Sequence, residues 1–272
     1  MTKKIALGLV ALVAVAASVV GLSAFEAHVI NVTAKIENAL SVTTEKLNFG
    51  TVFPQEHLEQ PLEITLSRSF VLEDRVDDVE YIIRQKPKCG VTENDGKTLV
   101  GPTWTGHVVP TVNDPATTEV DESKGGTAYT IDCGADKPKD LLVGTNQSAG
   151  LLPSLCEYIS KDGGDEDGQS SENDGTTPSF HKPFEVVAGV VNWLDTKGKL
   201  TKVFQDTVDN WIIDLAVPCF GDHCAQDWAD FVHGINPQAN PDQYVQDINN
   251  EHKIFGCNLW IEVAGVSETQ PE

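Results

Sequence analysis

The sequence lacks the short motifs that most often carry enzyme chemistry. It contains no G-x-S-x-G nucleophile elbow, no H-E-x-x-H zinc motif, no G-x-G-x-x-G dinucleotide loop and no phosphate-binding P-loop. Its 7 histidines are scattered, and acidic residues are so numerous that no pair stands out as an acid–base dyad. These absences predict a protein that is not an enzyme and requires no cofactor. A hydrolase whose site assembles from distant loops is the weakest alternative.

Basic residues are scarce as well. The chain has 19 lysines and arginines against 41 aspartates and glutamates, which gives a formal net charge of −22. A chain this acidic repels the phosphate backbone, so we expect no nucleic acid among its partners. The charge instead favours solubility and association with cations or basic partners.

Internal repeats, heptads and a regular alternation of strands with helices are also missing. Their absence argues against solenoids, coiled coils and parallel α/β folds. What remains is a series of short β-branched and aromatic runs bounded by turn residues. We therefore expect a mainly β fold, an antiparallel jelly-roll-like β-sandwich with long loop insertions and one or two short helices.

Residues 62–66 alternate most cleanly, which places Leu62, Ile64 and Leu66 on one buried face. Trp228, Phe231 and Val232 have the spacing of a short helix over residues 225–233. A second short helix is expected over residues 151–160. Further strands are expected over residues 28–36, 76–85, 127–133, 184–191, 208–217 and 253–263. Residues 161–178 are acidic and glycine-rich, so we expect a solvated insertion outside the core.

The N-terminus has the pattern of a secretory signal. Lys3 and Lys4 precede an apolar run that extends from residue 5 to Ala24. Cleavage after Ser23 or Ala24 by signal peptidase would leave residues 25–272 as a single sandwich domain at the cell surface or outside the cell. The alternative is a retained membrane helix, since about 20 apolar residues span a bilayer. Contact with a membrane is expected only through such an uncleaved N-terminus.

Six cysteines form an even set, which favours disulfides in an exported chain. Cys219 and Cys224 flank a turn-like segment and are the first expected pair. A metal site built from these two cysteines and His223 is the competing interpretation, although it lacks a fourth ligand. The sequence does not assign the partners of the other four, which are Cys89, Cys133, Cys156 and Cys257.

Two features bear on ligand binding. Asp162, Asp165 and Asp167 alternate with glycines in a loop that could offer oxygen ligands to calcium, although the EF-hand pattern is incomplete. The simpler interpretation is a solvated acidic loop. Trp104 and Trp193 lie in less regular segments and are the candidate exposed aromatics for stacking on a sugar, with a core role as the alternative.

The layout of the chain resembles the TasA and camelysin family of secreted matrix proteins, whose signals are of the SipW type. The resemblance rests on the apolar stretch 7–24, on residues 30–66 and on the closing aromatic strand 255–263. It implies a jelly-roll subunit that forms extracellular fibres with copies of itself. In that arrangement residues 25–36 would add a strand to a neighbour, with Val29, Ile30, Val32 and Ile36 as anchors.

The leading hypothesis is therefore a non-enzymatic, secreted surface or matrix protein that self-associates into fibres by adding its N-terminal strand to a neighbouring subunit. The N-terminal segment could instead be the first strand of its own sandwich or a tether to the membrane. The second hypothesis is a monomeric surface binding module, dependent on calcium in one version, that recognises a glycan or a protein.

Overall fold

The computed structural model describes residues 35–110, 129–134, 146–163, 175–203 and 206–268. The chain divides into two units, residues 1–37 and residues 38–272. Only residues 35–37 of the first unit are described, so the fold is that of the second unit. It is mainly β and antiparallel, as the sequence predicts.

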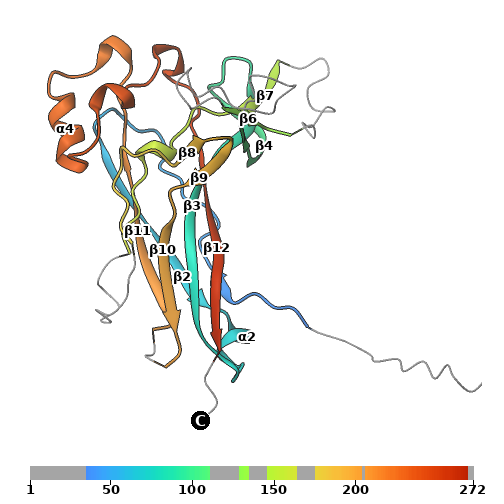
Figure 1. The fold of residues 1–272 in the computed structure, drawn as a ribbon. Helices are drawn as coiled ribbons and strands as arrows, with labels where there is room; N and C mark the ends of the chain where they lie inside the picture. The colour runs from blue at the N-terminus through green and yellow to red at the C-terminus, as the bar shows by residue number, and fades with distance from the viewer. Residues whose placement is uncertain (1–34, 111–128, 135–145, 164–174, 204–205, 269–272) are drawn as a thin grey trace, which may run out of the picture. The chain divides into compact units, whose positions relative to one another are not determined.

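A three-stranded sheet and a five-stranded sheet form the body of this unit (Figure 1). The first sheet has the order β1-β2-β11. The second has the order β10-β3-β12, and β4 (Leu99–Thr105) and β7 (Gln147–Leu151) also pair with β3 in it. Their bounds are β1 Leu40–Val42, β2 His57–Leu66, β11 Val208–Ala216, β10 Thr196–Thr201, β3 Val76–Glu93 and β12 Cys257–Glu268. β3 is thus longer than the strand predicted over residues 76–85. Its first part pairs with β10 and β12, and its last part pairs with β4 and β7.

Smaller elements surround the two sheets. β4 (Leu99–Thr105) and β7 (Gln147–Leu151) flank the end of β3, while β5 (His107–Pro110) pairs with β6 (Tyr129–Asp132), and β8 (Phe184–Val187) pairs with β9 (Val190–Trp193). The helices are α2 (Arg68–Val71), α4 (Trp228–Ile235) and the 3-10 turns η2 (Cys156–Tyr158), η3 (Gly221–His223), η4 (Pro241–Tyr244) and η5 (Ile248–Asn250).

The core lies between the two sheets. Leu62, Ile64 and Leu66 of β2 are buried on one face, as their alternation predicts. They meet side chains from both sheets, namely Val79, Tyr81, Ile83, Leu200, Trp211, Ile213 and Leu215. Across the core, the indole Nε1 of Trp211 donates to the hydroxyl of Tyr81 at 2.7 Å, and that hydroxyl donates to Asp209. The two sheets are therefore joined by polar as well as apolar contacts.

Several sequence predictions need correction. The single strand expected over residues 184–191 is a hairpin, in which Ala188 and Gly189 turn with φ of 50° and 76° between β8 and β9. The helix expected over residues 151–160 is only the three-residue η2. The expected helix near Trp228 forms as α4, which buries Trp228 and Val232 against the core.

The acidic segment 161–178 was predicted to be a solvated insertion, but both of its ends pair with the rest of the fold. The backbone of Lys161 exchanges two hydrogen bonds with Thr177, and Asp162 exchanges two with Ile212 of β11. Gly175 in turn donates to Lys197 of β10. These short pieces connect β11 with β10 and close one flank of the sandwich. Lys161 is fully buried and Thr177 is nearly so, whereas the neighbouring Asp162 is exposed, because side chains alternate between the two faces of a paired segment and that of Lys161 points inward to Gln85.

Tyr81 leaves no room for a side chain at Gly198. An added Cβ there would overlap the ring and hydroxyl of this fully buried tyrosine, which the Trp211 hydrogen bond holds in place. We expect Gly198→Ala to lower the free energy of unfolding by about 1–3 kcal/mol through overpacking. Gly150→Ala is the matched control, since a Cβ at Gly150 meets nothing within 4 Å. Urea denaturation of the two variants measures the difference, and equal stability would contradict the packing argument.

Candidate functional site

The flank opposite the closed one presents two strand edges. β1 pairs with β2 only at Ile64, Thr65 and Leu66, so the remainder of β2 has β11 as its one ladder partner among the described residues. On the free side of β2, Gln60 exchanges two side-chain hydrogen bonds with the backbone of Asn48, at 3.2 and 2.7 Å. The segment around Asn48 thus covers this edge without forming a ladder.

Pro61 makes the β2 edge a poor template for another strand. Proline has no N–H, and in a sheet it is tolerated where its nitrogen faces away from the paired neighbour. Pro61 lies opposite Ile212 of β11, and Ile212 exchanges its backbone hydrogen bonds with Asp162 instead, so the nitrogen of Pro61 faces the free side of β2. An incoming strand would find one hydrogen bond absent there.

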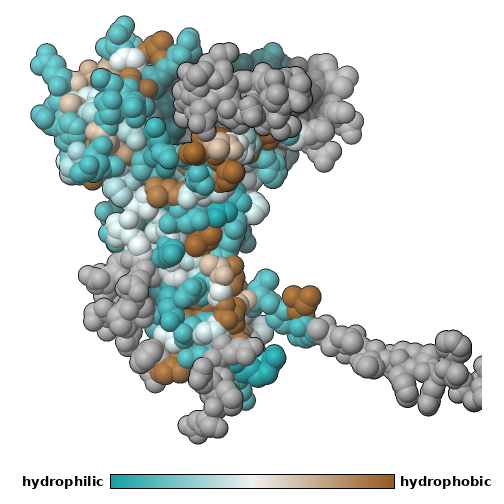
Figure 2. Space-filling model, in the orientation of Figure 1, coloured by the Kyte–Doolittle hydropathy of each residue, from teal (hydrophilic) through white to brown (hydrophobic). Residues whose placement is uncertain are grey.

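The outer edge of β12 is different. Along residues 257–263, β12 pairs in continuous register with Pro87–Tyr81 of β3, before the register shifts between Val263 and Gly265. Its other side has no ladder partner within the described ranges. Trp260 and Val263 are 39% and 46% exposed. Figure 2 shows hydrophobic surface along the strip where β12 runs in Figure 1. This edge therefore has a regular register and contains no proline, and it carries two partly exposed apolar side chains, Trp260 and Val263, on opposite faces of the strand.

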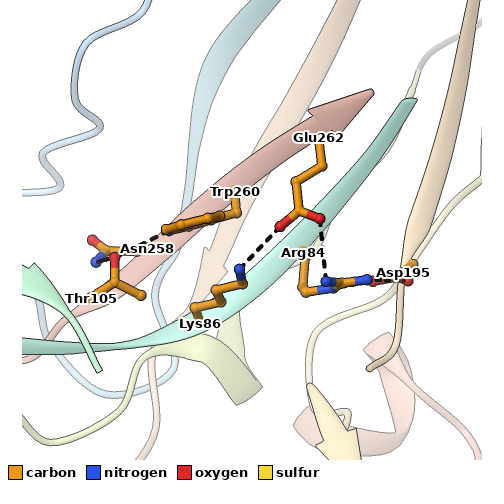
Figure 3. A network of polar contacts seen from close by, with 7 residues as sticks. All are labelled: Arg84, Lys86, Thr105, Asp195, Asn258, Trp260 and Glu262. Atoms are coloured by element: carbon orange, nitrogen blue, oxygen red, sulfur yellow. Dashed lines mark hydrogen bonds and ion pairs between the residues drawn. The ribbon is translucent and has the colours of Figure 1, made fainter. Parts of the chain in front are cut away.

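A cluster of aromatic and basic side chains covers the outer face of β3 and β12 (Figure 3). The ammonium of Lys86 lies 3.3 Å from the ring centre of Trp260, and the guanidinium of Arg84 lies 5.5 Å from that of Trp193. Glu262 accepts hydrogen bonds from both cations, at 3.0 and 3.3 Å. Cation–π contacts of this kind favour a fixed position of each ring beside its cation.

Two further contacts fix this cluster. Asp195 accepts two hydrogen bonds from Arg84, at 2.7 and 2.8 Å, and this carboxylate raises the pKa of the guanidinium. The indole Nε1 of Trp260 donates to the hydroxyl of Thr105 at 3.1 Å. The charges of the cluster are balanced, and Trp260 offers a rigid, partly exposed ring at the surface.

A second polar cluster is buried. The side chains of Gln85, Lys161 and His181 meet between β3 and the segment that pairs with β11, with exposed fractions of 0%, 0% and 7%. Gln85 Oε1 lies 2.7 Å from both Lys161 Nζ and His181 Nε2. A buried amine, amide and imidazole in contact is an unusual grouping for a sandwich core.

Comparisons with known proteins add no relative. No family model, curated protein or solved structure matches the chain. The site therefore has to be interpreted from its own residues.

The cysteines form three disulfides. Cys219 is bonded to Cys224, the pair that the sequence favours. The four cysteines left open pair as Cys89 with Cys133 and Cys156 with Cys257. With both of its cysteines oxidised, the alternative metal site at Cys219, His223 and Cys224 has no thiolate ligand to offer. In the described part of the chain, no helix is long and apolar enough to cross a membrane.

The candidate calcium ligands and the candidate anchors for strand addition lie only partly within the described residues. Asp165 and Asp167, like Val29, Ile30 and Val32, lie outside the described residues. The carboxylate of Asp162 accepts a hydrogen bond from Thr176 at 3.3 Å. No group of three histidines, cysteines or acidic residues that could hold a metal occurs within the described ranges. Ile36 is 94% exposed.

The two tryptophans singled out by sequence differ in environment. Trp104 is partly buried, and its indole donates to the backbone oxygen of Cys133 at 2.6 Å. Trp193 belongs to the aromatic and basic cluster, packed on Phe184 at 5.1 Å between ring centres. Sequence reasoning missed Trp260 and Lys161. For Trp260, the alternation in residues 258–262 was an available signal, since it puts Trp260 and Glu262 on the same face.

Proposed function

We propose that this chain is a non-enzymatic extracellular matrix or surface subunit that self-associates by strand addition. In this proposal residues 25–36 of one copy pair with the outer edge of β12 in another. The observation that carries it is the outer edge of β12 over residues 257–263, which has no ladder partner in the described part of the chain and whose two exposed apolar side chains are Trp260 and Val263. Main-chain hydrogen bonds would supply affinity, and the apolar side chains would supply register.

Two further observations support the proposal. The neighbouring edge of β2 is blunted by Pro61 and covered by the segment at Asn48, which leaves β12 as the better acceptor. Three disulfides are typical of proteins that fold in an oxidising compartment, as an exported matrix protein does. We also propose that the strands have a jelly-roll arrangement and that residues 1–24 are a signal that is cleaved.

The test is electron microscopy and light scattering on the mature, oxidised protein. We expect fibres or large oligomers, and we expect deletion of residues 25–36 to abolish them while the circular dichroism spectrum stays unchanged. Val263→Lys places a charge on the β12 edge and should also prevent assembly. Val187→Lys is the matched control, because Val187 is 52% exposed on the β8–β9 hairpin.

Monodisperse monomers under all conditions would overturn the assembly proposal. They would favour the second candidate, a monomeric module that binds a glycan or protein, with calcium as an optional ligand. The observation that supports this second candidate is the ring of Trp260, which Lys86 and Thr105 hold in place at the surface. Fibres that survive both the deletion and Val263→Lys would instead mean that assembly uses another surface.

A further inference from the structure

Gln85 presents a fixed carboxamide inside the protein. Its Nε2 donates to the backbone oxygens of Cys156 and Ile159, each at 3.0 Å. Its Oε1 accepts from Lys161 Nζ at 2.7 Å and lies 2.7 Å from His181 Nε2, which donates to it in the tautomer protonated at Nε2. All four hydrogen-bonding positions of the amide are used. The carbonyl group is thus held between an amine and an imidazole with its orientation set by η2.

Lys161 is placed as a nucleophile. Its side chain is fully buried, and no carboxylate forms an ion pair with it among the described residues. Burial lowers the pKa of Lys161 to about 7, opposed by the charge of Asp195. A large fraction of the amine is therefore neutral at neutral pH, and a neutral lysine amine attacks carbonyl carbons.

His181 is placed to polarise the same carbonyl. Its Nε2 faces Gln85 Oε1, and its Nδ1 lies 2.8 Å from the backbone oxygen of Pro178. An N–H at Nε2 donates to the oxygen on which negative charge would develop during attack at the carbonyl carbon.

We propose that Lys161 and Gln85 react with each other to form an intramolecular isopeptide bond. The neutral Nζ attacks Cδ of Gln85, and the carbonyl electron pair moves to Oε1, where the His181 N–H stabilises it. The intermediate then collapses with loss of Nε2, which takes the proton released by Nζ and leaves as ammonia. One C–N bond forms and one breaks, so the reaction needs no oxidant or cofactor.

The bond would connect the two sheets covalently. Gln85 belongs to β3 of the second sheet, whereas Lys161 precedes the residue that pairs with β11 of the first. It would also explain why one lysine at the start of an acidic, solvated loop is fully buried. This inference stands on the buried cluster alone and does not depend on the proposed strand addition.

The experiment is peptide mapping by mass spectrometry on the folded, full-length secreted protein after reduction and alkylation. We expect one branched peptide that contains both Gln85 and Lys161 and has lost one ammonia relative to the sum of its two parts. Separate linear peptides with unmodified Gln85 and Lys161 would overturn the proposal without the need for any variant.

Two variants test the assigned roles. His181→Leu removes the donor to Gln85 Oε1, so the branched peptide should disappear although both reacting side chains remain. Gln85→Glu keeps the carbonyl, and the linked peptide should then show loss of water instead of ammonia. A branched peptide at full yield in His181→Leu would remove His181 from the mechanism. If either variant misfolds, the peptide map of the unaltered protein still shows whether the isopeptide bond forms.

Discussion

Replacing Cys156 and Cys257 together with alanine should lower the free energy of unfolding by about 4.7 kcal/mol, the largest effect among the three disulfides. The bond closes a loop with a sequence separation of 101, and the entropy that a cross-link removes from the unfolded chain rises with the length of the loop. The disulfide also anchors η2, whose backbone at Cys156 holds the Gln85 amide. Guanidinium denaturation of the oxidised proteins measures the change.

The matched control is the double replacement of Cys219 and Cys224. Their sequence separation is 5, for which the same relation gives about 2 kcal/mol. The ratio between the two double variants is more informative than either value, because both remove two sulfur atoms. Equal destabilisation would mean that loop closure does not control the stability of this chain, and that local packing of the sulfurs does.

Acidification should destabilise the protein by several kcal/mol through His181. Burial lowers the pKa of His181 to about 3 from an ordinary value of 6.5. Between these two values the unfolded chain binds a proton that the folded chain does not bind. Stability therefore falls as the pH falls from 6.5 towards 3, by about 1.4 kcal/mol for each unit of pKa difference.

Thermal denaturation at several pH values tests this expectation, with His181→Leu as the reference. The difference in stability between the two proteins should shrink steadily as the pH falls from 6.5 to 4. Burial raises the pKa of the Glu157 carboxyl, so this group increases the stability of the protein as the pH falls. Because Glu157 is present in both proteins, its effect cancels from the difference between them. A pH-independent difference would mean that His181 is accessible to protons in the folded state.

The local patterns of the sequence predicted much of the sheet structure. The alternation of Leu62, Ile64 and Leu66 gave the correct buried face, because residues two apart in a strand share a face regardless of their partners. The spacing of Trp228 and Val232 indicated α4 for the corresponding helical reason. The hairpin at Ala188 and Gly189 was missed, since two four-residue strands of one hydrophobic run look like a single strand until they turn.

The candidate sites were harder to foresee. Trp260 joins the aromatic and basic cluster only because β12 pairs with β3 in a register that places it opposite Arg84. Lys161 appeared to open a solvated loop, yet it is enclosed by ladders to Thr177 and β11. The edges available for assembly depend on strand order, which no local pattern encodes.

The sequence by itself determined the class of fold, the buried faces of its best strands, the scarcity of basic surface and the presence of an even set of cysteines. These properties follow from composition and from spacing along a few residues. The tertiary structure decided the partners of four cysteines, the place of β12 at the end of its sheet's strand order among the described residues, and the contact among Gln85, Lys161 and His181. Each of these joins segments far apart in the chain, so their chemistry arises only when the strands assemble.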